Sequence, residues 1–294
     1  MIIIKYPVRI PPSGRKYKRK SPGNVAPLPL KKDAACGMIE YQRGEAMRNF
    51  KLTLCYEGSR YRGWQRQGNT ENTVQGRVET LLSRLLDQPI EVHGCGRTDA
   101  GVHARKQVCS FRADTALDCA ALLGKIRAHL PADIGAVSLE DAPERFHARL
   151  SCTGKCYLYR IWLGETPNVF ERRLLLFHPG PLDVEAMRQG AALLCGRHDF
   201  SAFCSVRNKK RSAVRELRDI EIVQTGEELR LYFTGDGFLY NLVRILTGTL
   251  LEIGEGRRSP ADLPRILASL DREQAGPTAP AQGLILWDLF YENI

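Results

Sequence analysis

No stretch of this 294-residue sequence approaches the roughly 18 consecutive apolar residues of a membrane-spanning helix, so a helical membrane protein is excluded. The apolar run at the amino terminus is also too short for the core of a signal peptide, and we expect no export. Hydrophobic residues make up 43% and charged residues 26% of the chain, a balance typical of soluble globular proteins. A chain of this length buries enough apolar surface to fold without disulfides or metal.

The nine cysteines contain no Cys-x-x-Cys pair, and an odd number does not fit a framework of paired disulfides. The closest pair, Cys152 and Cys156, lacks the spacing and the neighbours of a zinc site. We therefore predict reduced thiols, no metal ion and a cytoplasmic location, where thiols stay reduced.

Nucleotide-cofactor motifs are also missing. Residues 94–99 begin like a dinucleotide-binding fingerprint, but Asp99 replaces the third glycine and a strand, not a helix, is expected to follow. The Lys and Ser/Thr of a P-loop are absent, as is the His-x-Glu and Pro-Cys-x-x-Cys signature of zinc deaminases. The sequence thus disfavours binding of a nucleotide cofactor.

Basic residues are concentrated near the amino terminus. Residues 1–46 hold ten Lys or Arg against three acidic residues, whereas residues 47–294 hold 33 against 30. The first segment also holds six of the sixteen prolines and shows no hydrophobic period, which predicts a disordered basic leader. Its basic run fits phosphate binding or a targeting signal. We prefer the interpretation that it lies upstream of the true start, because Met47 directly precedes the first strand-like segment.

Strands and helices alternate from Phe50 onward. Thr73 is suited to cap a helix with apolar residues at helical spacing, and Ser259 with Pro260 marks the start of another. Helices are predicted at residues 74–86, 119–130, 183–195, 238–253 and from 259, and strands from residue 50 and at 89–94, 107–111, 134–139, 155–163, 214–223, 229–234 and 284–291. Two halves of similar pattern predict an α+β fold, with an N-terminal domain at 47–160 and a C-terminal domain at 161–294.

Two charged residues stand out in this pattern. Asp99 precedes a Gly-containing turn, where a carboxylate more often bonds the turn's own backbone than it does chemistry, and His103 is interpreted as a loop or core histidine. Arg244 lies in an apolar segment, 239–251, that predicts a buried helix. A buried arginine needs an anionic partner, and such a partner would stay ionised well below its usual pKa. The residues alone leave open whether this pair is structural or catalytic.

Five segments, in order, resemble the motifs of the tRNA pseudouridine synthase A family. They are YEGSRYRGWQRQ at 56–67, GRTDAGVHA at 96–104, FHAR at 146–149 with KCYLYR at 155–160, GFLYNLVR at 237–244 and AGPTAPAQGL at 275–284. The likeness runs from about residue 48 to residue 291. Leu242 stands where methionine is frequent, and the leader has no counterpart in the family.

The resemblance implies a pseudouridine synthase fold, in which two related ferredoxin- or RRM-like α+β halves with mainly antiparallel sheet flank a central active-site cleft. It implies isomerisation of uridine to pseudouridine at positions 38, 39 and 40 of the tRNA anticodon arm, by a homodimer without metal or organic cofactor. Asp99 takes the place of the catalytic aspartate and Arg244 that of its basic partner. Tyr157 takes the place of the tyrosine stacked on the target uracil, and Arg97 that of the arginine supporting the flipped nucleotide.

The chemistry suits these residue types. Breaking a glycosidic bond leaves positive character at C1′, which an ionised Asp99 can stabilise or attack, and removal of the C2′ proton is a further route. Binding of tRNA needs several phosphate contacts. The candidates are Arg60, Arg62, Arg66, Arg105, Lys106 and the basic residues of 207–211. The alternatives are a catalytically silent RNA-binding protein of the same fold and a synthase for another RNA.

Overall fold

The computed structural model describes residues 47–205 and 212–292. The predicted leader and the basic cluster at 207–211 lie outside the described residues. Within these ranges the chain forms one mixed sheet whose strands are β1 (Arg48–Tyr56), β2 (His93–Gly94), β3 (His103–Ala113), β4 (Ile134–Asp141), β5 (Cys152–Trp162), β6 (Leu176–Phe177), β7 (Gly196–Asp199), β8 (Val214–Thr225), β9 (Glu228–Gly235) and β10 (Leu284–Tyr291).

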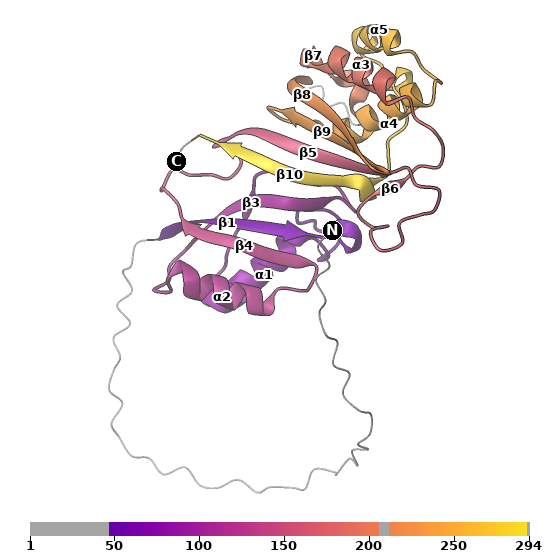
Figure 1. Ribbon diagram of the computed structural model, residues 1–294. Helices are drawn as coiled ribbons and strands as arrows, with labels where there is room; N and C mark the ends of the chain where they lie inside the picture. The colour runs from indigo at the N-terminus through magenta and orange to yellow at the C-terminus, as the bar shows by residue number, and fades with distance from the viewer. Residues whose placement is uncertain (1–46, 206–211, 293–294) are drawn as a thin grey trace, which may run out of the picture. The chain divides into compact units, whose positions relative to one another are not determined.

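The α-helices are α1 (Val74–Leu86), α2 (Cys119–His129), α3 (Val184–Leu194), α4 (Leu242–Gly254) and α5 (Leu263–Ser269), and 3₁₀ turns lie at Gly58–Arg60, Ser201–Phe203, Pro260–Asp262, Arg272–Gln274 and Ala281–Gly283. Helices α1 and α2 cover the N-terminal strands, whereas α3, α4 and α5 gather on the C-terminal strands (Figure 1). None of the helices in the described ranges is long and apolar enough to cross a membrane.

Each half of the sheet repeats the same strand order. The N-terminal strands lie in the order β4-β1-β3-β2 and the C-terminal strands in the order β10-β5-β9-β8, all in antiparallel pairs. In both halves the chain contains a β-α-β-β-α-β motif whose fourth strand lies beside the first, the ferredoxin-like arrangement, and the C-terminal half adds β6, β7 and α5 to it. This confirms the predicted α+β fold with two related halves.

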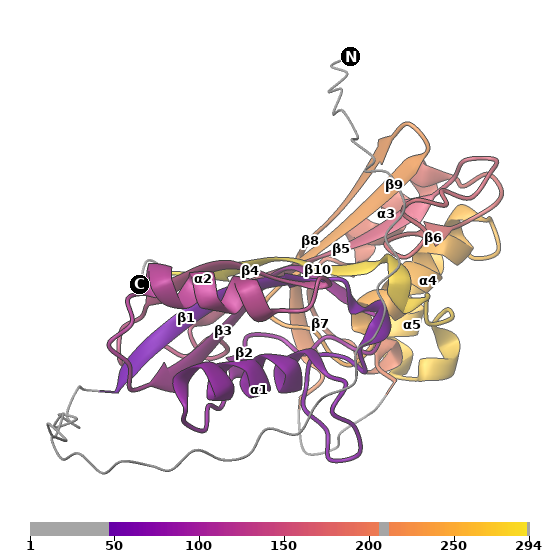
Figure 2. The same ribbon diagram turned by 90° about the horizontal axis from the view of Figure 1, so that it is seen from below.

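The last strand joins the two halves. β10 runs antiparallel to β5 along its length, but it meets β3 in parallel only at Ile285–His103 and Leu286–Ala104 (Figure 2). Because this contact is so short, the two halves of the sheet diverge beside it. The predicted domain boundary between residues 160 and 161 stays a prediction, since β5 is hydrogen-bonded to both β10 and β9 without a break in the sheet.

Local signals explain most of the elements. Thr73 caps α1 by accepting a hydrogen bond from the Gly76 N–H, as predicted, and the helix buries Val78 and Leu82 on its inner face. Several predictions were wrong in extent, among them the strand predicted at 107–111, which spans His103–Ala113. Two further differences concern the starts of other elements. The strand predicted at 89–94 is limited to His93–Gly94, and α4 begins at Leu242 instead of residue 238. The cause of the second error is Asn241, whose φ of +62° breaks the helical path and leaves residues 238–241 as a turn.

Candidate active site

A cleft of about 1100 Å³ lies between the two halves, as the family resemblance implied. The segment before β3 supplies Arg97 and Asp99, β5 supplies Tyr157, and the turn before α4 supplies Phe238 and Asn241. Three of the four predicted site residues therefore share one cavity. The fourth, Arg244, lies in the first turn of α4, next to the lining residues Asn241 and Val243 in the chain.

The loop that carries Asp99 is held on both sides by buried groups. The Gly96 N–H donates to Gln107 Oε1 at 3.3 Å, and Gln107 Nε2 donates to the Gly96 carbonyl at 2.6 Å. The Thr98 hydroxyl hydrogen-bonds to the Tyr56 hydroxyl at 2.8 Å. Gly63 has a φ of +93°, and a Cβ there would lie 2.6 Å from the Thr98 carbonyl oxygen, so only glycine fits. The loop is thus pre-organised before any substrate binds.

His103 ties three of the sequence motifs together. Its Nδ1 accepts a hydrogen bond from the Gly58 N–H at 2.8 Å, so Nε2 carries the proton and donates to the Gln282 carbonyl at 3.1 Å. The side chain is only 2% exposed, and this burial lowers its pKa. Both ring nitrogens of this neutral imidazole are engaged inside the protein, so neither is available to exchange a proton with a substrate. The interpretation of His103 as a core histidine is confirmed.

Asp99 is half-buried and its carboxylate forms no hydrogen bond within the described residues. Burial raises the pKa of Asp99, and the nearby positive charge of Arg244 offsets only part of that effect. The sequence-based expectation of a pKa well below the usual range is therefore wrong in direction. Loss of hydration outweighs the attraction, because the two charged groups are not in direct contact. A carboxylate that bonds to none of the residues in 47–205 and 212–292 remains available to a substrate.

Arg244 is engaged by neutral groups. Its Nε donates to the Ala279 carbonyl at 2.6 Å, and one terminal nitrogen donates to Asn241 Oδ1 at 2.9 Å. Within residues 47–205 and 212–292, no ion pair joins Arg244 to Asp99, so the predicted direct pair is not formed. The guanidinium is half-buried, which leaves it in part hydrated and explains why it needs no anion in contact. Arg244 acts on Asp99 through space, across the cleft wall.

Tyr157 presents a fixed aromatic ring to the cleft. It is 7% exposed, and the ring of Phe238 packs edge-on against it with centroids 5.0 Å apart and an interplanar angle of 80°. Its hydroxyl lies beside Gly96, where a Cβ would be 3.7 Å away, and makes no hydrogen bond within the described residues. Burial, together with the negative charge of nearby groups such as Asp99, raises the pKa of Tyr157, so the phenol stays protonated.

Basic side chains line the cleft, and among them only Arg97 was a candidate from the sequence. Arg97 is exposed and forms no hydrogen bond or ion pair within the described residues, and Arg149, Lys155 and Arg215 line the same cavity. The surface candidates lie elsewhere: Arg60 pairs with Asp133, Arg66 with Glu79 and Lys106 with Asp288, Arg105 stacks on Trp287, and Arg62 does not line the cleft.

Among the lining residues to which sequence reasoning gave no role, two support the site directly. Lys155 Nζ donates to the Cys95 carbonyl at 2.8 Å, just before the loop that carries Asp99, and Phe238 supports Tyr157. The signal for Lys155 was available, because residues two apart in a strand share a face and Tyr157 is its i+2 neighbour. Phe238 was placed in a helix, which hid its role. The described residues hold no cluster of three or more side chains suited to a metal ion.

The comparisons with known proteins agree with this geometry. The profile of a family described as tRNA pseudouridine synthase matches residues 54–150 and 191–292, more than half of the chain. The chain therefore belongs to the tRNA pseudouridine synthase family.

Curated relatives are more specific in name. The tRNA pseudouridine synthase A 2 of Bacillus anthracis is 40% identical over 240 residues, which cover 82% of this chain and 98% of that protein. The tRNA pseudouridine synthase A of Geobacillus kaustophilus (strain HTA426) is 42% identical over 244 residues, 83% of this chain and 94% of that protein.

Among solved structures, a chain from the "Crystal Structure of a Cbf5-Nop10-Gar1 Complex" aligns with 69% of this chain and 45% of its own length. The sequence identity is 15% and the TM-score 0.32, a likeness too weak to carry a structural argument.

Proposed function

We propose that this protein isomerises uridine to pseudouridine at positions 38, 39 and 40 of the tRNA anticodon arm, and that it works as a homodimer in the cytoplasm. Membership of the tRNA pseudouridine synthase family and the names of the relatives support the reaction and tRNA as its substrate. The positions, the dimer and the location rest on the resemblance of the sequence motifs. One structural observation carries the assignment of the site: Asp99, whose carboxylate forms no hydrogen bond to any described residue, shares a cleft with a supported aromatic ring, Tyr157.

The reaction breaks the N1–C1′ bond of uridine and forms a C5–C1′ bond. C5 loses its proton and N1 gains one, so no atom is added and no redox partner is needed. Asp99, when ionised, opposes the positive character that develops at C1′. Three routes are open to this carboxylate: it stabilises C1′ by its charge alone, it forms a bond to the sugar, or it takes the C2′ proton. Each of these routes requires the carboxylate in its ionised form.

Arg244 has two roles in this proposal. Its charge favours the ionised form of Asp99 against the cost of burial. It also fixes the turn before α4, because it donates to Asn241 Oδ1 and to the Ala279 carbonyl. That turn carries Phe238, which supports the aromatic wall. A substitution of Arg244 therefore affects both the charge and the shape of the site.

Tyr157 holds the detached uracil while it turns. Stacking of a base on an aromatic ring contributes about 1–3 kcal/mol, comparable to the few kcal/mol that extrusion of a nucleotide costs. Arg97 is exposed at the cleft and free of protein partners within the described residues, so it is suited to occupy the space that the extruded nucleotide leaves. The remaining basic lining residues contribute phosphate contacts, and binding weakens as salt rises.

The test is to incubate the full chain with unmodified tRNA and to map pseudouridine along the whole molecule. Pseudouridine at positions 38, 39 or 40 is the expected result. Modification confined to other positions contradicts the site assignment on the tRNA, and tight binding without turnover supports a silent RNA-binding protein instead. Sedimentation of the purified protein, alone and with tRNA, tests the homodimer.

A further inference from the structure

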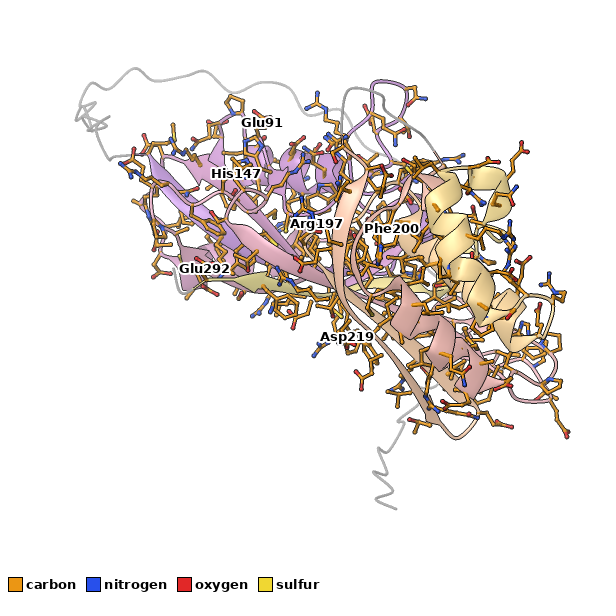
Figure 3. The ribbon with its side chains drawn as sticks, turned by 90° about the horizontal axis from the view of Figure 1, so that it is seen from above. Glu91, His147, Arg197, Phe200, Asp219 and Glu292 are labelled. Carbon is orange, nitrogen blue, oxygen red and sulfur yellow. The ribbon has the colours of Figure 1, made fainter. Side chains whose placement is uncertain are left out.

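A second cavity of about 710 Å³ adjoins the cleft on the N-terminal half. Glu91, His93 and His147 line both hollows, so the second opens directly beside the first. Glu91 and His147 lie at the same edge of the N-terminal half, whereas Phe200 lies on the C-terminal half (Figure 3). A volume of this size falls in the range of about 300–1,000 Å³ that is usual for small-molecule sites.

Two imidazole rings form the ridge between the hollows. His93 and His147 stack with ring centroids 5.0 Å apart and an interplanar angle of 27°. The ring of His147 is fixed, because its Nδ1 accepts hydrogen bonds from the backbone N–H groups of Arg149 at 3.1 Å and Leu150 at 3.3 Å. His93 packs on one face of that ring and keeps 45% of its own side chain exposed.

Hydrogen bonds from buried groups hold the loop beneath His147. The buried Asn49 amide donates to the carbonyls of Pro143 at 2.8 Å and Phe146 at 2.9 Å, and the Ala148 N–H donates to Ser110 Oγ at 3.1 Å. The polar side-chain atoms of the cavity floor are thus used to hold the backbone of this loop in place. A surface that is ordered in advance costs little entropy when a ligand binds.

The chemistry of the cavity fits a base better than a phosphate. Burial, and the repulsion between neighbouring imidazoles, lower the pKa of His147, so its ring offers a neutral π surface behind the His93 ring. The charged lining residues comprise two acidic and two basic side chains, Glu91, Glu144, Arg112 and Arg145. Such a set gives no net attraction for an anion, but it supplies donors and acceptors for the edge of a base. Unpaired RNA bases are commonly bound in this way, by stacking on aromatic or His side chains with hydrogen bonds to their edges.

We propose that this cavity is a subsite for an unpaired RNA base close to the target uridine, which stacks on the exposed face of His93. This inference rests on the proposed function, since an RNA in the cleft is what brings a neighbouring base to the ridge. The ridge then fixes the register of the RNA, so that the target uridine meets Asp99. His93 and His147 are positioning residues in this proposal and take no part in the chemistry.

The experiment uses the full chain and tRNAs that carry 2-aminopurine at single positions around positions 38 to 40. The fluorescence of this base falls when it stacks. We expect quenching on binding at one such position, and its loss in two variants, His93→Ala and His147→Asn. Asn at position 147 keeps an acceptor for the backbone N–H groups and removes only the ring. We expect each variant to raise the KM for tRNA by about tenfold, within the range that base stacking contributes, and to leave kcat within about twofold.

Two controls separate stacking from other effects. His93→Phe keeps a flat ring and should restore quenching and KM, whereas His129→Ala removes an exposed histidine on α2 and should change neither. Two results would refute the subsite while pseudouridine still forms and the proposed function stands. One is that the parent protein quenches 2-aminopurine at no position; the other is that the parental quenching persists at every position in both His93→Ala and His147→Asn. If tRNA binds and no pseudouridine forms at all, the proposed function fails, while the quenching pattern still tests the stacking of a base.

Discussion

Gln107 and Gly96 are joined by both atoms of one side-chain amide, at 2.6 Å and 3.3 Å, in a site where Gln107 is fully buried. Gln107 lies on β3, and Gly96 lies three residues before Asp99. One side-chain amide therefore connects the hydrogen-bonded sheet to the loop that carries the carboxylate. Positioning of Asp99 depends on this pair, because the carboxylate has no hydrogen bond of its own within the described residues.

We expect Gln107→Met to destabilise the protein and to slow turnover. Methionine fills a similar volume but leaves the Gly96 N–H and carbonyl unpaired in a buried site, which costs about 1–3 kcal/mol. Urea unfolding measures that loss, and we expect kcat to fall more than the affinity for tRNA. Gln224→Met is the matched control, because Gln224 is an exposed glutamine on β8 that bonds only to its own turn. Unchanged kcat in a destabilised Gln107→Met protein would contradict the role of the amide in positioning Asp99.

Asp99→Asn should abolish turnover without destabilising the fold. Asn cannot ionise, and it has the same shape as Asp. At neutral pH the protein bears the cost of burying the Asp99 charge, as its raised pKa indicates, and the neutral amide removes that cost. We expect a free energy of unfolding equal to that of the parent or up to about 1 kcal/mol higher, and a Kd for tRNA within about tenfold. Asp114→Asn changes an exposed aspartate and serves as the control. A clear loss of stability in Asp99→Asn, with Asp114→Asn unaffected, would show that the carboxylate is structural.

The sequence predicts the elements of this fold better than it predicts their exact ends. The start of α1 follows from a capping Thr73 and a regular apolar period, and β10 has the predicted bounds. The start of α4 does not follow, because the apolar period continues through Phe238 while the backbone at Asn241 turns left-handed. The apolar period depends only on which residues are apolar. A single residue with positive φ ends the helix without changing that period, so the sequence pattern does not reveal it.

The sequence likewise predicts which residues form the site better than it predicts their electrostatic environment. The motifs predicted that Arg97, Asp99 and Tyr157 share a site, and the structure has all three in one cleft. The argument that a buried Arg244 needs an anionic partner gave the wrong direction for the pKa of Asp99. That sign depends on how deeply the carboxylate is buried and on whether Arg244 touches it. Both are properties of packing between segments far apart in the chain. Arg244 instead bonds Asn241 and Ala279, contacts that no sequence pattern indicated.

Tyr157→Phe should fold and bind tRNA like the parent. The ring that packs against Phe238 is kept, and the lost hydroxyl has no hydrogen-bond partner within the described residues. We expect the free energy of unfolding to change by less than about 0.5 kcal/mol. Tyr157→Ala, in contrast, should lose about 3–5 kcal/mol, as for other large aromatic residues in a core. If Tyr157→Phe binds tRNA normally but loses turnover, the hydroxyl has a chemical role in addition to stacking.

The pH dependence of activity tests the environment of Asp99. The ionised form is the active one, so activity is lost as the pH falls through the pKa of Asp99. Because burial raises that pKa, we expect the acid limb of kcat/KM to lie above the value of about 3.9 for an ordinary aspartate. Arg244 lowers the same pKa, so its removal should move the limb to still higher pH.

Arg244→Gln is suited to this test, since its amide remains able to donate to the Ala279 carbonyl. Arg244→Lys retains the charge and should move the acid limb less than Arg244→Gln does, whereas Arg265→Gln, an exposed change on α5, should leave it in place. The three profiles, measured at equal ionic strength, separate the charge of Arg244 from its hydrogen bonds. A limb in Arg244→Gln that stays at the parental pH, in a protein that still binds tRNA, would show that Arg244 acts only as a structural support for the turn before α4.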